Sequence, residues 1–361
     1  MLMHKMLIMV LVLTVFAVGQ GLALDRPGDV FKIFQFPANM IPRINGKADD
    51  WAMVPDDYAI GMDQLVDDAK HGKPDLKRLD AKVKVGWVKG MNRLYFLFEA
   101  TKSYWDFALP GLHNDTFEIV VDGDLSGGPL IDELRNNPEV VDKNDAYFSM
   151  HGVHAQNYHI FTPAENKDWC MVWGPHPWLK DLPYANAAYG YDFRPGESGK
   201  LTLTFWVTPF DFVGSDPSKM IETQLVENKL IGLSYALIDY GDVNAKSSVA
   251  FWNLSRHHDM FGNADHLCAF KLMPLEAQFL KKIEARWSFK VVDMDRRLVA
   301  FKDESVGKVS SWKWDLGDGQ TSTEQNPQHA YEKAGHYVVV LDIEGPDGKS
   351  RRSKVWDVAV K

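Results

Sequence analysis

The sequence predicts an all-β protein made of two tandem antiparallel β-sandwiches. Short runs of alternating apolar and polar residues recur along most of the chain, which is the period-two pattern of half-buried strands. Turn-forming Gly, Pro and Asn residues separate these runs, as they do between the strands of a sandwich. A length of 361 residues suggests about two domains, and 45% apolar residues are enough to build a core in each.

Residues 1–23 have the features of a secretory signal peptide. A short start with one Lys precedes an apolar run at residues 7–18, and Gly21-Leu22-Ala23 supplies small residues before the expected cleavage point. The run is shorter than the ~20 residues of a membrane span, and an uncleaved anchor helix is the alternative. We therefore expect a secreted protein, extracellular or periplasmic, with no membrane span after cleavage. A net charge of −9 argues against nucleic acid as a partner.

The first sandwich is expected at residues 24–273. Its clearest strand is the run TFEIVVD at 116–122, in which Phe117, Ile119 and Val121 share one face. Thr116, Glu118, Val120 and Asp122 then share the opposite, polar face. Further strands are expected at 82–88, 93–100, 146–152, 156–162, 169–173, 200–207, 230–240, 248–254 and 266–273.

A linker is expected at 274–286 and a second sandwich at 287–361. The linker has apolar residues at helical spacing (Leu275, Phe279, Leu280 and Ile283), which predicts a short helix. The second region holds alternating runs such as GHYVVVLDI, each bounded by Gly, Pro or Asp turns.

The second region closely resembles a polycystic kidney disease (PKD) domain. The matching residues are Trp312, Trp314, the run Asp315-Leu316-Gly317-Asp318-Gly319, Asn326-Pro327, His329, Tyr331, Gly335, Tyr337 and the valines 338–340. The resemblance implies an immunoglobulin-like sandwich used outside the cell as a spacer or adhesion module, with a cell-surface protein as one candidate partner. The residues agree, because Asp315 and Asp318 can cap the glycine-containing turn. Calcium binding by these two acids is the alternative, and we expect His329 to be a hydrogen-bonded structural residue.

The first region resembles a family 9 carbohydrate-binding module, within the DOMON-like sandwiches. The resemblance rests on INGKADDWA from Gly46 to Trp51, on VKVGWVKGMNRLYFLFEAT, on NDTFEIVVDGD with its acids Asp115 and Glu118, and on FGNADHLCAFKLM. It implies binding of sugar ends or chains between aromatic side chains, and structural calcium in some members. This chain departs from the pattern by an insertion at about 125–200, which leaves the position of the site open.

Candidate sugar-binding residues lie in and beside that insertion. A sugar ring offers an apolar C–H face to a flat aromatic ring, and its hydroxyl rim hydrogen-bonds to carboxylates and amides. Trp178, on a Pro-broken segment, is the favoured stacking platform, with Trp173 and Tyr184 near it in the chain. Glu118 and Asp115 are candidate acceptors for sugar hydroxyls. The alternatives are that the aromatic residues pack the insertion onto the sandwich and that Glu118 is merely solvated.

Metal and haem chemistry have weaker sequence signals. Asp122 and Asp124 lie in a tight acidic turn whose oxygens suit a structural calcium ion, although the spacing is not that of an EF-hand. Two stretches are rich in histidine, 150–159 and 255–266, and pairs such as Met260 with His154 would suit a DOMON-like haem. No covalent haem motif is present, and we expect most of these histidines to be surface or hydrogen-bonded residues.

The remaining residues favour binding over catalysis. None of the common hydrolase, metalloprotease or P-loop motifs occurs in the sequence, although acid pairs such as Asp115 and Glu118 could in principle form a glycosidase dyad. Cys170 and Cys268 could form one disulfide or remain a buried free pair. The sequence thus predicts an exported, non-catalytic protein that binds a polysaccharide or glycan. The alternatives are a structural or adhesion protein, a haem protein and a glycoside hydrolase.

Overall fold

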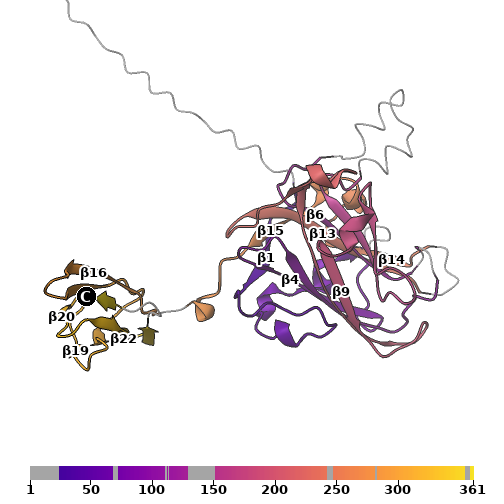
Figure 1. The fold of residues 1–361 in the computed structure, drawn as a ribbon. Helices are drawn as coiled ribbons and strands as arrows, with labels where there is room; N and C mark the ends of the chain where they lie inside the picture. Colours follow the sequence, from indigo (N-terminus) through magenta and orange to yellow (C-terminus); the bar gives the residue numbers. More distant parts are fainter. Residues whose placement is uncertain are drawn as a thin grey trace, which may run out of the picture. The chain divides into compact units, whose positions relative to one another are not determined.

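A computed structural model describes residues 24–67, 72–109, 112, 114–128, 151–241, 247–280, 283–353 and 358–361. The chain divides into two compact units, residues 1–275 and 276–361. Every regular element in the described part is a strand or a short 3-10 turn, so the predicted all-β class is confirmed (Figure 1). The two units are described separately below.

The strands of the first unit follow one continuous path. Its order is β8 (Cys170–Trp173), β7 (Gln156–Phe161), β6 (Thr116–Asp122), β13 (Leu230–Asp239), β15 (Cys268–Leu272), β1 (Asp25–Phe36), β4 (Leu79–Val88), β5 (Leu94–Lys102), β10 (Gly199–Val207) and β9 (Ala185–Gly190). Shorter strands flank this path: β14 (Ala250–Asn253), β3 (Val66–Asp67) and β2 (Ile60–Gly61), with β11 (Phe210–Phe212) and β12 (Ile221–Glu222) as a separate pair.

Strand β1 joins the two layers of the sandwich. Residues 25–33 pair with β15, and residues 34–36 pair with β4. We call the part from β8 to β15, with β14 and β3, the β6 sheet, and the part from β4 to β9, with β2, the β5 sheet. Both pairings of β1 are parallel, so the expectation of a purely antiparallel sandwich is wrong at this strand. The strands β15, β1 and β4 lie side by side in Figure 1.

The inner faces of the two sheets form the core, as the alternation in β6 predicts. Phe117, Ile119 and Val121 are fully buried there. The ring of Phe117 stacks on Phe98 of β5 at 4.8 Å and meets Phe205 of β10 at 6.1 Å. The burial of these rings between the sheets removes apolar surface from water and holds the layers together.

Part of the outer face of the β5 sheet is covered by the segment that follows β1. Trp51 meets the ring of Phe36 edge-on at 5.0 Å. The backbone N–H groups of Asn45 and Gly46 both donate to Thr204 Oγ1 on β10. Gly46 has φ +69°, and a Cβ atom there would lie 2.3 Å from the carbonyl carbon of Tyr189. The Gly-to-Trp turn of INGKADDWA therefore packs directly against this sheet.

The segment expected as an insertion builds strands of both sheets. Its described part contributes β7 and β8 to the β6 sheet and β9 to the β5 sheet. The predicted strand at 146–152 falls mostly outside the described residues, and His151 and Gly152 form a turn. Cys170 and Cys268 are both buried and free. They lie on β8 and β15, four strand positions apart in the sheet, which is too far for a disulfide at ~4.8 Å per strand.

The predicted helix between the units is wrong. The described part of 274–285 holds only a single 3-10 turn, η8 (Ala277–Phe279). Ile283 and Ala285 are buried in the core of the second unit instead. The helical spacing of apolar residues was misleading, because Ile283 packs in the core of the second unit whereas Leu280 is 53% exposed.

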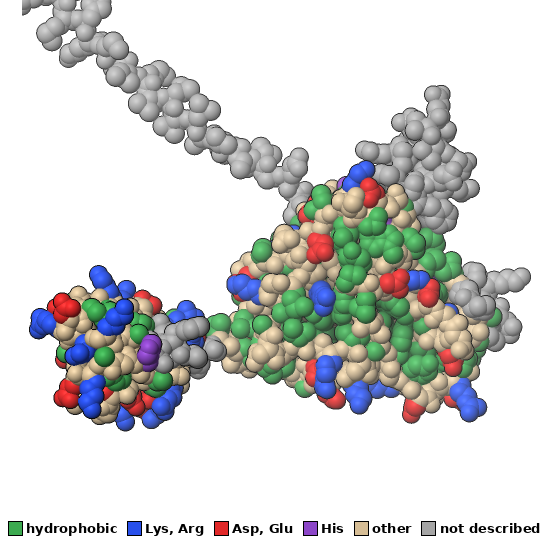
Figure 2. Space-filling model, in the orientation of Figure 1, with side chains coloured by type: hydrophobic (Ala, Val, Ile, Leu, Met, Phe, Trp, Pro, Cys, Tyr) green, Lys and Arg blue, Asp and Glu red, His purple; other side chains and the backbone are tan. Residues whose placement is uncertain are grey.

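The second unit is a small sandwich, as predicted. One sheet has the order β16 (Trp287–Asp293), β17 (Leu298–Asp303) and β20 (Gln328–Ala330), and the other has β19 (Thr321–Ser322), β18 (Ser311–Asp315), β22 (Val340–Gly345) and β23 (Gly348–Ser353). Strands β21 (Gly335–Tyr337) and β24 (Val358–Val360) form a further pair. Trp314 and Leu341 are fully buried at its centre. In Figure 2, charged side chains of both signs are interspersed over the visible face of this unit.

Candidate functional site

The outer face of the β6 sheet carries an unusual row of buried polar side chains. Strand register sets Glu118 opposite His159, and Asn157 opposite both Val120 and Trp173. Because side chains alternate along each strand, these residues all point away from the core. Glu118 is only 5% exposed and His159 only 7%, although both lie on the outside of the sandwich. A buried polar group is costly unless it has partners, so each of these groups needs an explanation.

Part of this polar row holds a loop against the sheet. Asn253 Nδ2 donates to the carbonyl of His257 at 2.8 Å, and Asn157 Nδ2 donates to the carbonyl of Phe261 at 3.4 Å. Ser234 Oγ accepts from the Ser255 N–H at 3.1 Å. Apolar residues add to the attachment, because Met260, Ala264 and Leu267 are buried in a cluster with residues of the sheet. We call residues 255–267 the β14–β15 loop.

The rest of the row forms what we call the outer-face cluster: Glu118, Asn157, His159 and Trp173. His159 Nδ1 lies 3.9 Å from Glu118 Oε1, and its Nε2 is 3.1 Å from Thr116 Oγ1. The ring of Trp173 meets the His159 ring edge-on at 6.5 Å and stacks on His151 at 5.8 Å. Trp173 is partly exposed, whereas Asn157 is fully buried.

The outer-face cluster contains acceptor groups that can take further hydrogen bonds. Within the described part of the chain, Asn157 Oδ1 has no hydrogen-bond partner. His159 Nδ1, 3.9 Å from Glu118 Oε1, is beyond hydrogen-bond distance of that carboxylate. An indole and a carboxylate on the same face of a sheet are groups that can meet the C–H face and the hydroxyl rim of a sugar.

Asp115 occupies a different place and has a full set of partners. Its carboxylate accepts from Lys102 Nζ at 2.5 Å, from the Asp106 N–H at 2.7 Å and from the Tyr240 N–H at 2.8 Å. Lys102 also contacts Asp239 at 2.7 Å, and Arg78 pairs with Asp239 through two nitrogen atoms. Asp115 and Lys102 are both almost fully buried. This ion-pair network gives Asp115 a structural role in place of the sugar contact expected for it.

Trp178 and Tyr184 lie together at the edge of the sandwich, away from the Asp115 network. Trp178 is in the 3-10 turn η4 (Pro177–Lys180), which follows edge strand β8, and Tyr184 immediately precedes edge strand β9. Their rings meet edge-on at 5.2 Å, and both side chains are half-buried against the main core. The turn thus packs the segment between β8 and β9 onto the sandwich, and it leaves part of both rings at the surface.

Asp122 and Asp124 shape the turn after β6. Asp122 accepts from the N–H groups of Leu125 and Gly127 at 2.8 and 2.9 Å, and Asp124 accepts from the Ser126 N–H at 3.1 Å. Burial raises the pKa of Asp122 to about 7, and the neighbouring Asp124 carboxyl acts in the same direction. The backbone engages both carboxylates, and calcium binding by them stays a prediction.

Two residues of the cluster were missed in the sequence. Asn157 and His159 lie in QNYHIFT, where they alternate with Tyr158 and Ile160 of the core. The alternation alone places them on an outer face. It could not show that β7 pairs with β6 in a register that puts His159 beside Glu118. Of the haem-ligand candidates, the His154 ring lies 3.3 Å from the Asp211 carbonyl, and Met260 is buried in an apolar cluster.

In the second unit, the acidic turn is built as predicted. Asp315 accepts from the Gly317 N–H and Asp318 from the Gln320 N–H, both at 3.0 Å. The other oxygen of Asp318 lies 2.7 Å from His329 Nε2. These contacts confirm that the two acids cap the turn and that His329 is a hydrogen-bonded structural residue.

Among the described residues, none lies in a helix long and apolar enough to cross a membrane. The chain is similar over short stretches to two proteases: collagenase ColQ1 of Bacillus cereus (strain Q1) is 51% identical over 53 residues, and the pre-pro-metalloprotease PrtV of Vibrio cholerae serotype O1 (strain M66-2) is 39% identical over 66 residues. The matches cover 15% and 18% of this chain and only 5% and 7% of those relatives.

One solved structure is similar to most of the chain, and one family model matches its C-terminal part. A family 9 carbohydrate-binding module from Caldicellulosiruptor kristjanssonii, solved with cellotriose, covers 70% of this chain and 97% of its own, with 12% identity and a TM-score of 0.43. Residues 296–360 match the family model of the PKD domain. This match shows that the second unit contains a PKD domain, as its sequence motif predicted.

Proposed function

We propose that the protein is an exported, non-catalytic carbohydrate-binding protein whose first unit binds a polysaccharide or glycan and whose PKD domain acts as a spacer or adhesion module. The observation that carries the proposal is the outer-face cluster. It places a partly exposed indole next to Asn157, whose Oδ1 has no partner among the described residues, and two strands away from the carboxylate of Glu118 on the same face of the sheet. The expected sugar-binding fold of this region, based on sequence resemblance, points the same way.

The geometry suggests how a sugar would be held. The C–H face of one ring stacks on the exposed part of Trp173, and a hydroxyl group of the sugar donates to Glu118. His159 lies between Glu118 and Trp173, 3.9 Å from the carboxylate and edge-on to the indole. Because Glu118 and His159 are nearly buried, the recess suits a single ring better than a flat crystalline surface, which would need a broad exposed aromatic strip.

The Trp178–Tyr184 pair remains the alternative platform. Its two rings are partly exposed and meet edge-on at 5.2 Å. An enzymatic role receives no support from the acid pair, because Asp115 is tied to Lys102 and to two backbone N–H groups. A glycosidase needs both of its carboxyl groups to face the scissile bond.

Affinity electrophoresis and calorimetry on a panel of soluble polysaccharides and oligosaccharides test the proposal. We expect Trp173→Ala to weaken binding about tenfold or more, because ring stacking with its buried area contributes on the order of 1.5 kcal/mol. Glu118→Gln, which keeps the shape of the side chain, should weaken it as well. Glu99→Gln on β5, whose carboxylate pairs with the exposed Lys200, is the matched control.

The outcomes separate the two platforms. If Trp178→Ala abolishes binding and Trp173→Ala does not, the sugar binds at the sandwich edge and the outer-face cluster is structural. If the folded wild-type protein binds no carbohydrate on the panel, the sugar-binding function is refuted, and adhesion through its two sandwiches becomes the leading function.

A further inference from the structure

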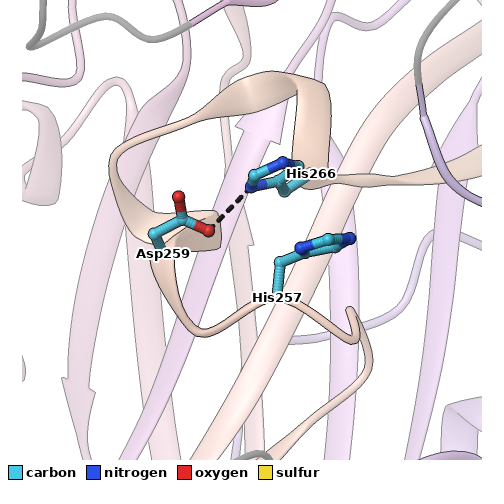
Figure 3. A group of neighbouring side chains, drawn as sticks. All are labelled: His257, Asp259 and His266. Carbon is cyan, nitrogen blue, oxygen red and sulfur yellow. Dashed lines mark hydrogen bonds and ion pairs between the residues drawn. The ribbon is translucent and has the colours of Figure 1, made fainter.

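Two histidines and an aspartate converge on the surface of the β14–β15 loop, apart from the outer-face cluster. His257, Asp259 and His266 each offer a donor atom, and these three atoms lie within 4.8 Å of one another. His266 Nδ1 is 2.7 Å from Asp259 Oδ1, and the two imidazole rings stack at 3.9 Å with planes 12° apart (Figure 3). All three side chains keep solvent exposure, so an ion could reach them directly.

A second carboxylate lies beside the group. Asp25, at the start of β1, has one oxygen 3.6 Å from His257 Nε2. Its other oxygen accepts from the Arg256 N–H at 2.5 Å, which fixes its position next to the loop. The Asp25 side chain is only 9% exposed. Two imidazoles and two carboxylates thus come together from segments more than 200 residues apart in the sequence. The fold, and not the local sequence, places Asp25 beside the loop.

The loop that presents these residues is firmly attached. Met260 and Ala264 lie between the candidate ligands in the sequence, Leu267 follows the last of them, and all three are buried. Asn253 holds the carbonyl of His257, and the Asn263 side chain accepts from the Asp265 N–H at 3.1 Å, one residue before His266. Anchors of this kind hold donor groups near their final positions, and pre-positioned donors bind an ion with less ordering cost.

The donor set has a definite chemical preference. Imidazole nitrogen with carboxylate oxygen suits zinc, cobalt, nickel or copper, whereas calcium and magnesium take oxygen donors almost alone. Zinc commonly binds three protein ligands and a fourth group, which is water in open sites. One adjustment is required: a metal lies in the plane of each imidazole that binds it, and stacked rings do not share a plane. The ring of His257 is 48% exposed and is free to rotate about its χ2 bond.

We propose that His257, Asp259 and His266 form a binding site for a divalent transition-metal ion of the zinc class, with Asp25 as a neighbouring carboxylate. The ion takes the place of the direct contact between His266 Nδ1 and Asp259 Oδ1. It ties β1 to the β14–β15 loop, and it does so whether or not the first unit binds carbohydrate.

Isothermal titration of the purified protein with zinc chloride tests the site, with a purification tag that contains no histidine. We expect one saturable site per chain. His257→Ala and His266→Ala should each weaken zinc binding at least tenfold, since even the loss of a residue that supports a ligand costs about 10- to 100-fold. The matched control is His258→Ala, which removes a histidine from the same loop that is not among the converging donors. Calcium chloride should give no saturable binding at this site.

Cobalt gives an independent readout. Visible absorption bands of the cobalt-loaded protein report nitrogen and oxygen ligation directly, and they should be lost in His266→Ala. Asp259→Asn keeps the loop shape and should weaken zinc binding as well. Thermal unfolding without metal verifies that each variant is folded. Absence of a saturable zinc site in the folded wild-type protein, or unchanged binding in both histidine variants, would overturn the proposal.

Discussion

Replacing Lys102 by Met should be among the most damaging single changes in the first unit. The Lys102 ammonium is 2% exposed and contacts Asp115 at 2.5 Å, Asp239 at 2.7 Å and the Tyr240 carbonyl at 2.9 Å. Its removal leaves Asp115 buried with two backbone N–H groups and no cation, whereas Asp239 keeps Arg78. Breaking a buried ion pair from one side costs about 3–5 kcal/mol. We expect the free energy of unfolding to fall by this amount at pH 8.

The loss should depend on pH in a defined direction. Burial raises the pKa of Asp115 to about 7 in the wild-type protein, against the lowering effect of Lys102. A carboxyl with a raised pKa holds an extra proton when folded, so its contribution is fully present below about pH 4 and is lost as pH rises through the folded-state pKa. Without Lys102 this pKa rises further. The variant should keep losing stability above pH 7, by up to about 1.4 kcal/mol per pH unit relative to wild type.

Urea unfolding at pH 6, 7 and 8 measures both effects. Lys200→Met is the matched control, because Lys200 is 61% exposed and pairs with Glu99 on the same strand pair, β5 and β10. Exposed pairs contribute about 1 kcal/mol or less. A deficit below about 1 kcal/mol for Lys102→Met at pH 8, or a deficit that does not grow between pH 6 and pH 8, would refute this view of the network.

Three further predictions concern other parts of the chain. Gly46→Ala should destabilise the first unit by about 2 kcal/mol or more in urea unfolding, because φ is +69° and the new Cβ would meet the Tyr189 backbone at 2.3 Å; a change within 0.5 kcal/mol would contradict the close packing of this turn. Cys170 and Cys268 should react with a thiol reagent only in denaturant, with the same stoichiometry before and after reduction; a mass change on reduction would reveal a bridge instead. Burial raises the pKa of Asp318, but the hydrogen bonds from His329 and the Gln320 N–H outweigh it and hold the pKa below its ordinary value. That contribution is present at neutral pH and is lost on acidification, so hydrogen exchange in β18 and β22 of Asp318→Asn should respond less to a fall from pH 6 to pH 3 than in wild type.

Alternation along single strands was read correctly from the sequence. In β6 it separated Phe117, Ile119 and Val121 of the core from Glu118 on the outer face, because successive side chains in a strand must point to opposite sides. The PKD turn was equally readable, since its capping contacts join residues two apart in the chain. Contacts between residues this close in the chain can be predicted from the local sequence alone.

Features that depend on pairing across the sheet could not be predicted. Glu118 and Asp115 looked alike in NDTFEIVVDGD, yet only the fold shows that Lys102 and Asp239 converge on Asp115. The position of His159 beside Glu118 depends on the register of β7 against β6. The helix wrongly predicted at 274–285 has the same origin. The apolar spacing in the sequence could not show that Ile283 packs in the core of the second unit.

The position of β1 between β15 and β4 has a consequence for how the chain folds during synthesis. Asp25 pairs with Cys268, a sequence separation of roughly 240 residues, and contacts of such high separation form late and slow folding. Strand β1 is therefore synthesised before the other strands of its unit, but the β6 sheet cannot close until β15, the last strand of that unit, has also been synthesised. Until then, the edges of β1 and β13 lack their final neighbour and are open to pairing with other chains. A nascent chain stalled before residue 268 should accordingly remain protease-sensitive and bind chaperones, and release of a few more residues should convert it to the resistant form.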